Sequence, residues 1–308
     1  MKQYLQLLKE IKENGIWKDD RTGTWVRWLF WMQAKYDLLE WFPLVTTKKT
    51  FLRWIVVELI WLLRWDTNIK YLVDRDVHIW DEWPFQNYLE TNLLTGAYPK
   101  YSDVWFEEKQ NFINKIKSLP ETDQFVIEWW ELGPIYWHQW RNFNSEWIDQ
   151  IKYIIDQIKS NPTNRRIIVS AWNPAQIDKM LLPPCHAFFQ FNVDTTNNKL
   201  NLQLYQRSAD MFLWVPFNIA SYSTLLLLIA KITWLKPWVF THTLWDAHIY
   251  NNHVDQVELQ LSREPRDLPE LKILKDIKTL EDIEKLEWED FKLVWYNPYE
   301  RIVWAVAV

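Results

Sequence analysis

The amino-acid sequence predicts a single α+β domain in which a mixed β-sheet packs with helices. Segments with helical spacing of apolar residues and segments with strand-like alternation are both present. They are interspersed without the regular βαβ rhythm of parallel-sheet proteins. The chain of 308 residues contains no internal repeat and no low-complexity linker, and it is long enough to bury one large core.

Four segments are predicted to be helices because their apolar residues recur every three or four positions: residues 2–14, 52–64, 148–159 and 216–232. Gly15 ends the first of these helices, Pro162 follows the third, and Pro216 opens the fourth. These are positions at which glycine and proline are favoured around helices.

Four further segments are predicted to be strands: residues 165–172, 187–193, 199–206 and 241–250. A polar turn at 194–198 joins the middle two, and we expect the last strand to run into a second segment. Residues 84–129 are polar with scattered aromatic residues and resemble an insertion between two better-patterned blocks. We therefore place residues 1–308 in one domain.

The net charge is −5, so an anionic ligand has to be held by a local cluster of basic residues. The first fifteen residues lack the apolar core of a signal peptide, and the longest apolar run, near 225–230, is too short to span a bilayer. The single cysteine excludes an intrachain disulfide and fits a reducing compartment. We predict a cytoplasmic protein with no membrane or DNA partner.

Cys185, in the sequence Leu-Pro-Pro-Cys-His, is the candidate nucleophile. The prolines fix the local backbone, and His186 provides a polar setting in which a thiolate can be available. A lone cysteine is more often a small buried apolar residue, and that interpretation stays open.

Arginines at the ends of predicted strands are the candidate anion ligands. Arg165 and Arg166 open one strand, Arg207-Ser208 closes another, and Arg21 lies in the loop Asp-Arg-Thr-Gly-Thr. Forked guanidinium donors in an acidic protein suit a phosphate group. The alternative is solvated surface charge, which is usual for a single arginine.

Glu58 lies inside the apolar helix 52–64 and is a candidate for proton transfer. Burial among apolar neighbours would raise the pKa of its carboxyl group toward the range that such chemistry uses. A helix-edge ion pair with Arg53 or Arg64 explains the same residue equally well.

Asn218, His248 and Tyr250 are candidates for binding a nucleotide. A side-chain amide has one acceptor and two donors, which suits a pyrimidine edge, although a helix N-cap explains Asn218 as well. His248 and Tyr250 alternate on one face of a strand and could reach a sugar hydroxyl, or they are simply paired strand side chains. The sequence contains no glycine-rich phosphate loop and no metal-ligand spacing, so we expect no metal site.

Ten segments spread from end to end closely resemble the thymidylate synthase family. They are DRTGT (20–24), FPLVTTKK (42–49), ELIWLLRWDTN (58–68), HIWDEW (78–83), ELGPIYWHQWR (131–141), RRIIVSAWNP (165–174), LPPCHAFFQF (182–191), LQLYQRSADMFLWVPFNIASY (202–222), DAHIYNNH (246–253) and QLSREPR (260–266).

This resemblance implies a homodimer, with one face of the sheet as its interface, that converts dUMP to dTMP. It implies 5,10-methylenetetrahydrofolate as carbon donor and reductant, dihydrofolate as the second product, and no metal. Cys185 would add to C6 of the uracil, Glu58 and Tyr136 would manage protons, and Asn218 would read the uracil edge.

The resemblance also implies the binding residues. The residues that it places against dUMP are Arg21, Arg165, Arg166, Arg207, Ser208, Ala209, Asp210, Asn218, His248 and Tyr250. Arg165 and Arg166 would reach the phosphate in the partner's site, and Arg207 would also lower the pKa of Cys185. The residues that it places against the folate are Ile79, Trp80, Asp210, Ala307 and Val308, of which the last two would close over the site.

The nearest rival is a deoxycytidylate hydroxymethylase, whose family typically has aspartate where this chain has Asn218. Asparagine therefore favours uracil over cytosine. Phe51 stands where some members have a folate-contacting histidine, so that role is not carried over. Binding of its own messenger RNA, suggested only by family analogy, gains no support from the negative net charge.

Glycine and tryptophan are out of balance. The chain contains 4 glycines and 24 tryptophans, whereas average usage gives roughly 22 glycines. The resemblance expects tryptophan at five positions: Trp61, Trp80, Trp83, Trp140 and Trp172. It expects glycine at ten others: Trp25, Trp31, Trp41, Trp65, Trp130, Trp137, Trp214, Trp234, Trp238 and Trp245.

We hypothesise that this imbalance reflects the genetic code. UGA encodes tryptophan in one variant code and glycine in another, so translation with the wrong table writes tryptophan for glycine. The 24 tryptophans less the five expected ones leave up to nineteen such positions. Side chains at glycine sites would cost about 1–3 kcal/mol each, and ten of them would exceed a total stability of about 5–15 kcal/mol. If the tryptophans are real, a fold-retaining but inactive chain is the alternative.

Overall fold

The computed structural model describes residues 1–19, 23–66 and 68–303. The chain forms two compact units, each assembled from separate stretches of sequence. One unit contains residues 1–56, 151–170 and 185–308, and the other contains residues 57–150 and 171–184. The α+β class predicted from the sequence is confirmed.

The first unit is built on a six-stranded sheet with the strand order β1-β2-β6-β5-β4-β3. Its strands are β1 (Ile16–Lys18), β2 (Val26–Asp37), β3 (Ile168–Ser170), β4 (His186–Asp194), β5 (Lys199–Asp210) and β6 (Lys236–Tyr250). Strands β5 and β6 pair in parallel and the other neighbours are antiparallel, so the predicted mixed sheet is confirmed.

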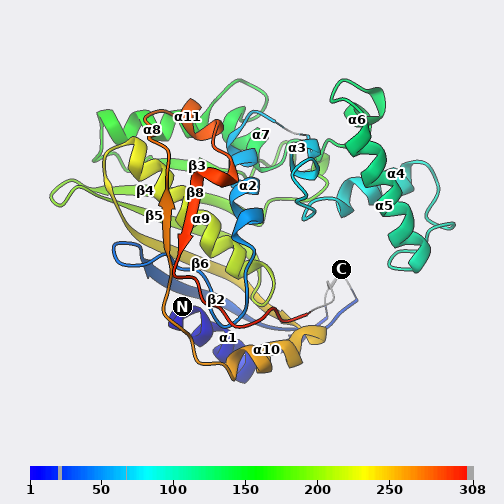
Figure 1. Cartoon of the computed structure of the whole chain (residues 1–308), viewed down its shortest axis with the longest axis horizontal. Helices are drawn as coiled ribbons and strands as arrows, with labels where there is room; N and C mark the ends of the chain where they lie inside the picture. The colour runs from blue at the N-terminus through cyan, green and yellow to red at the C-terminus, as the bar shows by residue number, and fades with distance from the viewer. Residues whose placement is uncertain (20–22, 67, 304–308) are drawn as a thin grey trace. The chain divides into compact units, whose positions relative to one another are not determined.

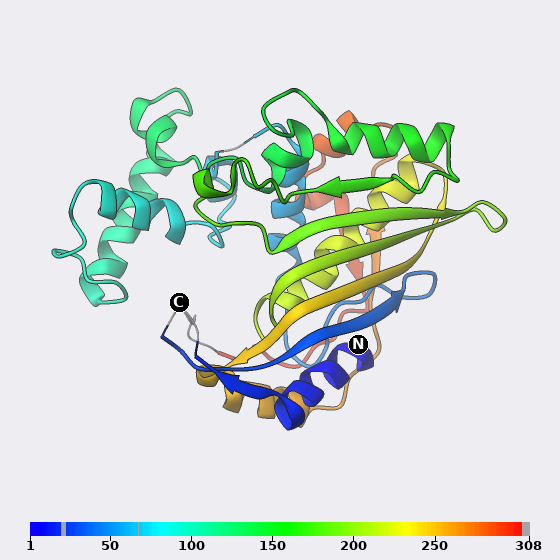
Figure 2. The ribbon, with the colours of Figure 1, turned by 180° about the vertical axis from the view of Figure 1, so that it is seen from behind.

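Helices and a two-stranded sheet complete the first unit. They are α1 (Lys2–Asn14), α8 (Gln150–Ser160), α9 (Trp214–Ile232), α10 (Val254–Leu261) and α11 (Leu280–Glu284), the 3₁₀ turns η2 (Asn251–His253) and η3 (Trp288–Asp290), and strands β7 (Glu270–Ile273) and β8 (Phe291–Val294). The four long strands lie side by side with α9 behind them (Figure 2), while α1 packs against β2 and α10.

Helix α9 positions the middle of the sheet because it is apolar on nearly all sides and packs on β5 and β6 (Figure 1). By length and composition it could cross a membrane, but 83% of its most apolar window is buried inside the protein. Such burial is typical of the core helix of a globular protein.

The second unit is mainly helical, and helix α2 (Leu52–Leu63) leads the chain into it. Its other helices are α3 (Lys70–Val73), α4 (Glu82–Thr91), α5 (Asp103–Ser118), α6 (Gln124–Trp129), α7 (Tyr136–Arg141) and the 3₁₀ turn η1 (Ile177–Lys179). The insertion-like segment 84–129 contains most of α4 and all of α5 and α6. The buried rings of Phe85, Trp105 and Phe112 pack at centroid distances of 5.3 Å.

The predicted helices agree with α1, α2, α8 and α9 to within two residues at each end. The strands agree less well. Residues 241–250 belong to one strand that begins earlier than predicted, at Lys236, and runs directly into η2 and α10. Strand β3 is shorter than predicted because a turn, in which Arg166 N donates to Asn164 Oδ1 at 2.9 Å, precedes it.

Four tryptophans adopt the left-handed backbone conformation that favours glycine. Their φ angles are 62° for Trp31, 60° for Trp147, 55° for Trp234 and 61° for Trp295. All four side chains are exposed, between 67% and 78%, so burial of the ring offsets little of the backbone strain. Trp31 and Trp234 were expected to be glycine sites from the resemblance, whereas Trp147 and Trp295 were not assigned.

Three other tryptophans at expected glycine sites have buried indole nitrogens. These nitrogens, in Trp130, Trp137 and Trp245, have no hydrogen-bond partner within the described ranges. A buried donor without an acceptor costs about 1–3 kcal/mol. Backbone conformation and side-chain bonding therefore both disfavour tryptophan at positions where the family has glycine.

Candidate active site

Cys185 lies directly before β4, at the point where that strand meets the end of β5. The main-chain N–H of Arg207 donates to the main-chain oxygen of Cys185 at 2.8 Å, so the thiol-bearing residue and the arginine are fixed on adjacent strands. Cys185 is a free cysteine and is partly exposed. Its interpretation as a small buried apolar residue is therefore wrong.

Asn218 lies in the first turns of α9 and is held by the side chain of Gln206. Gln206 Nε2 donates to Asn218 Oδ1 at 3.1 Å, and His242 Nε2 lies 2.7 Å from Gln206 Oε1. The helix begins at Trp214 with Leu213 as its N-cap, so the interpretation of Asn218 as a cap is wrong.

His186 and His242, which lie beside the hydrogen-bonded amides of Gln206 and Asn218, are neutral. Burial lowers the pKa of His186 to about 4, although its hydrogen bond with Asn218 opposes this shift. Burial, with the nearby His186 as a second cause, lowers the pKa of His242 to about 3. The amide of Asn218 is thus oriented by neutral, buried partners rather than by mobile charges.

The sequence analysis missed Gln206 and His242, although a pattern could have revealed them. In β5 the alternating buried positions are Leu200, Leu202, Leu204 and Gln206, followed by Ala209 and Asp210, and in β6 the buried positions include Phe240, His242 and Leu244. A polar residue that interrupts the buried face of an alternating strand needs a partner, and here the two interruptions are hydrogen-bonded to each other.

His248 and Tyr250 lie near the end of β6, with ring centroids 5.1 Å apart. The expected placement of both side chains on one strand face is confirmed. Burial lowers the pKa of His248, but its hydrogen bond with Asp246 and the charges of Asp210 and Asp246 outweigh burial and raise the pKa above its usual value.

Asp210 ends β5 and holds the turn that leads into α9. Its Oδ1 accepts hydrogen bonds from the main-chain N–H groups of Phe212 at 3.1 Å and Leu213 at 3.0 Å. Ser208 and Ala209 precede it on the strand and pair with Asp246 and Ala247 of β6. The structure therefore places the end of β5 beside the part of β6 that carries His248.

Arg165 and Arg166 are exposed residues just before β3. Gln190 Nε2 donates to the main-chain oxygen of Arg165 at 2.9 Å, which fixes this stretch against β4. A polar surface hollow of about 600 Å³ includes both arginines, and its lining residues are Tyr153, Gln157, Asn161, Thr163, Asn164, Arg165 and Arg166. Two adjacent guanidinium groups at such a surface suit an anion.

In the second unit, Glu58 of α2 accepts a hydrogen bond of 2.7 Å from the indole nitrogen of Trp80. Burial raises the pKa of Glu58 to about 7, and the Trp80 hydrogen bond opposes that shift because it favours the carboxylate. The predicted rise in the pKa of Glu58 is confirmed. Tyr136, at the start of α7, is buried, and its ring centroid lies 6.1 Å from that of Trp80.

The remaining predicted residues divide into two groups. Ile79 precedes Trp80 in the second unit and is partly exposed. Arg21, Ala307 and Val308 lie outside the described residues.

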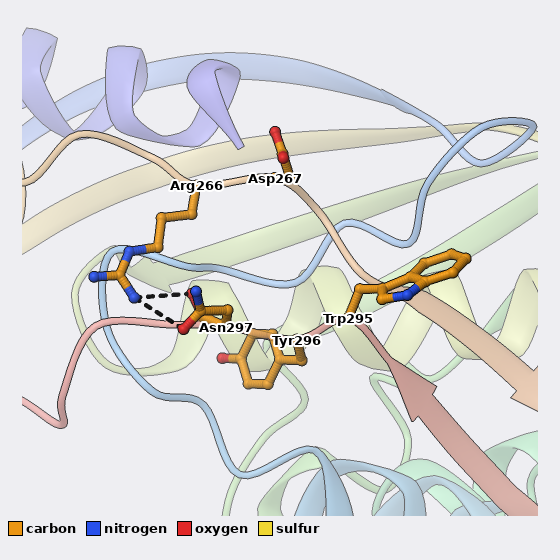
Figure 3. Close-up of a pocket in the computed structure, with 5 residues that line it drawn as sticks. All are labelled: Arg266, Asp267, Trp295, Tyr296 and Asn297. Carbon is orange, nitrogen blue, oxygen red and sulfur yellow. Dashed lines mark hydrogen bonds between the residues drawn. The ribbon is translucent and has the colours of Figure 1, made fainter.

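A second surface hollow, of about 680 Å³, is lined by Arg266, Asp267, Trp295, Tyr296 and Asn297 (Figure 3). Arg266 Nη1 donates to Asn297 Oδ1 at 3.0 Å, and Tyr296 Oη donates to the main-chain oxygen of Val45 at 2.8 Å. These bonds fasten the segment after β8 to the preceding chain. Among the residues that the structure describes, no predicted site residue lines this hollow, and we interpret it as structural.

The first unit thus combines a partly exposed cysteine, an arginine bonded to it through the main chain and a fixed amide, while the second unit holds a carboxyl group of raised pKa. Such features define an enzyme that can attack an electrophilic carbon and bind an anionic substrate.

Comparison with known proteins identifies the family. The family model described as "Thymidylate synthase" matches residues 2–308. The protein named thymidylate synthase in Mycoplasma mobile is 51% identical over 308 residues, and those of Malacoplasma penetrans and Mycoplasma genitalium are 49% and 47% identical. Each alignment covers 100% of both chains. The chain therefore belongs to the thymidylate synthase family, whose members are methyltransferases that form dTMP.

Proposed function

We propose that this enzyme methylates dUMP reductively through a covalent bond between Cys185 and C6 of the uracil. The thiolate adds to C6, the electron pair of the C5=C6 bond moves to C5, and C5 becomes the nucleophile. C5 then forms a bond to the one-carbon unit, the C5 proton is removed, and the bond between that unit and the folate breaks. A hydride from the folate completes the methyl group, and the C6–S bond breaks to release the thiolate, which leaves dTMP and dihydrofolate. Covalent addition divides a difficult alkylation into easier steps.

The observation that carries this proposal is the main-chain hydrogen bond of 2.8 Å from Arg207 N to Cys185 O, which holds the two residues next to each other, so that the guanidinium of Arg207 would be able to approach the thiol. A guanidinium group near a thiol favours the thiolate, which is the reactive form. Arg207 and Ser208 would also bind the phosphate of dUMP, together with Arg21 and, more loosely, Ala209.

Asn218 would read the uracil edge, and His248 and Tyr250 would hold the sugar. Because Gln206 donates to Asn218 Oδ1, the NH₂ group of Asn218 is the end of the amide that would donate to a carbonyl such as O4 of uracil. Glu58, with its pKa of about 7, would exchange protons and order water near neutral pH, and Tyr136 would support removal of the C5 proton.

5,10-Methylenetetrahydrofolate would supply the one-carbon unit and the hydride. Two side chains suit such a co-substrate. Asp210 provides a buried carboxylate that accepts from ring N–H groups, and Trp80 provides an aromatic surface. Ile79 would contact the folate beside Trp80. Ala307 and Val308 would close over it and exclude water.

We further propose that the enzyme is a cytoplasmic homodimer whose interface is the sheet face opposite α9. A row of rings crosses β4, β5, β6 and β2. Phe188 stacks on Tyr205 at 4.9 Å, Tyr205 lies 5.4 Å from Trp245, and Trp245 lies 4.7 Å from Phe30. Phe30 and Phe188 are exposed in one chain, and a second copy would cover them. Arg165 and Arg166 would then reach the phosphate in the partner's site.

Tritium release from 5-³H-dUMP, with and without the folate, tests the activity. The assay compares the tryptophan-containing chain with a glycine-decoded chain, in which glycine replaces the ten tryptophans that are expected to be glycine. Folate-dependent release by the glycine-decoded chain supports the proposal. Release from neither chain contradicts it, and turnover of dCMP instead of dUMP would favour the hydroxymethylase.

A further inference from the structure

Asp246 lies two residues before His248 on β6, and its carboxylate faces the histidine ring. Nδ1 of His248 lies 3.1 Å from Asp246 Oδ1 and 3.1 Å from the main-chain oxygen of Asp246. Burial would raise the pKa of the Asp246 carboxyl, but the hydrogen bonds with His248 and Lys18 outweigh it and hold that pKa below its usual value, so Oδ1 is an acceptor. The main-chain oxygen is an acceptor in any case. Nδ1 must therefore carry a hydrogen, and Nε2 is the ring nitrogen left for a ligand.

The second oxygen of Asp246 is held by Lys18. Lys18 is the last residue of β1, and its Nζ donates to Asp246 Oδ2 while lying 4.0 Å from the ring of Trp28. Strands β1 and β6 are not neighbours, since β2 lies between them. The Lys18–Asp246 ion pair thus crosses over β2 and fixes the carboxylate from the side opposite His248.

The surroundings of His248 favour one arrangement of its ring. The side chain is 6% exposed, and the groups that face it are the carboxylates of Asp246 and Asp210, the ring of Tyr250 and, beyond Asp246, the ammonium of Lys18. Both carboxylates favour a proton on the imidazole. A buried ring that is bonded at Nδ1 and packed against Tyr250 has little freedom to rotate.

We propose that Asp246, held by Lys18, is a positioning residue for nucleotide binding: it fixes the Nδ1–H form of His248 so that Nε2 points to the 3′-hydroxyl of dUMP. The inference rests on the proposed role of His248 as a sugar ligand. The deoxyribose of dUMP has one free hydroxyl, at C3′, so a single well-oriented nitrogen can recognise it. Asp246 itself does not touch the nucleotide.

Equilibrium binding of two nucleotides tests this role. One is dUMP, and the other is 2′,3′-dideoxyuridine monophosphate, which lacks only the 3′-hydroxyl. The parent chain, which is whichever of the two chains releases tritium, should bind dUMP about tenfold more tightly than the dideoxy analogue. In Asp246→Asn, in which the main-chain oxygen of residue 246 still accepts from Nδ1 but the carboxylate is lost, this ratio should fall about threefold or more while the affinity for the analogue stays the same. Equal losses for both nucleotides would mean that Asp246 is merely structural and would overturn the proposal.

A second variant and a spectroscopic measurement keep the test independent of folding. Lys18→Met removes the ammonium but leaves Asp246 in place, and should reduce the ratio about threefold. Lys35→Met, an exposed lysine on β2, is the matched control and should change nothing. Long-range ¹H–¹⁵N spectra of His248 should report the Nδ1–H form in the parent and a mixture of tautomers in Asp246→Asn. A ring that keeps one tautomer in that variant contradicts the proposal.

The outcomes separate this proposal from the function on which it rests. If the parent chain binds neither nucleotide, the proposed substrate is wrong. If it binds both equally, His248 does not read the hydroxyl. If it prefers dUMP and Asp246→Asn keeps that preference, only the positioning role of Asp246 fails.

Discussion

Gln206 Nε2 donates a hydrogen bond of 3.1 Å to Asn218 Oδ1, and this bond fixes which end of the Asn218 amide is free to meet a base. Gln206 is 2% exposed and is held in turn by His242. Asn218, the residue proposed to bind the pyrimidine edge, is therefore oriented by the hydrogen-bonded side chains of Gln206 and His242. Specificity depends on this orientation, since a rotated amide presents an acceptor where uracil O4 needs a donor.

Asn218→Asp should shift the preference of the enzyme from dUMP toward dCMP. An aspartate oxygen can still accept from Gln206, so the side chain stays in place, but it offers cytosine an acceptor for its amino group and offers uracil O4 no donor. We expect a change of at least about tenfold in the ratio of kcat/KM values for the two nucleotides. An unchanged ratio would remove Asn218 from its reading role.

Cys185→Ser should retain dUMP binding and lose turnover by at least about a thousandfold, because a serine hydroxyl is far less nucleophilic than a thiolate. Titration calorimetry measures the binding, and tritium release from 5-³H-dUMP measures the turnover. Near-normal turnover would be incompatible with covalent addition by Cys185.

Trp80→Phe should raise the pKa of Glu58 further above 7, since it removes the hydrogen bond of 2.7 Å that favours the carboxylate. A bond of this kind contributes about 1 kcal/mol, so the Glu58-controlled limb of the pH–kcat profile should move up by up to about one pH unit. The control is Trp83→Phe, whose ring contacts Trp80 at 5.3 Å. Equal shifts in both variants would contradict the assignment of this limb to the Glu58–Trp80 pair.

His242→Gln should flatten the acid side of the stability curve. Burial lowers the pKa of His242 to about 3, whereas an unfolded histidine titrates near 6.5. The resulting stability is fully present above about pH 6.5 and is lost as the pH falls, because the unfolded chain takes up a proton that the folded chain does not. The slope is about 1.4 kcal/mol per pH unit below that value.

Urea unfolding of the parent and of His242→Gln between pH 4.5 and 6 measures the difference. The variant should lose this contribution and show a slope smaller by about one proton, whatever its absolute stability. Parallel curves would show that His242 is protonated in the folded protein.

The sequence predicts the helices well where one strong pattern dominates. Helix α9 is apolar on nearly all sides, and α1 carries a regular apolar stripe, so both were located to within two residues. Strand β2 was missed, because its burial alternates only in its second half and its first half leaves Phe30 and Trp31 exposed. The apolar residues of 84–129 do not recur at a regular spacing, although aromatic residues far apart in the segment form its core.

The site was predictable mainly where a residue type is chemically distinctive. Cys185, Glu58 and the arginines stand out in the sequence by their neighbours alone. Gln206, His242 and Asp246 act through other side chains, and their roles depend on which strands are adjacent. The sequence does not contain that information locally, because β6 pairs with β2 and β5 across separations of about two hundred and about forty residues.

Replacing Trp31, Trp147, Trp234 or Trp295 by glycine should stabilise the protein, because each has φ between 55° and 62°. Relief of this conformation is expected to add about 1–2 kcal/mol per site to the free energy of unfolding. Alanine at the same site is the matched control, since it removes the indole but keeps the Cβ atom, and it should recover much less. Denaturant unfolding of the Gly and Ala variants of each residue gives the comparison, and equal effects would show that the ring, not the backbone, is responsible.

The same four positions test the genetic-code hypothesis. If it is correct, the gene has UGA codons at Trp31, Trp147, Trp234 and Trp295, as well as at buried sites such as Trp137, and the protein made by its own host carries glycine there. UGG codons at these positions would refute it. Intact-mass measurement of protein from the native host is an independent check, because every glycine in place of tryptophan lowers the mass by the same fixed amount. Trp147 and Trp295 are decisive, since their backbone conformation, and not the family resemblance, assigns them to glycine.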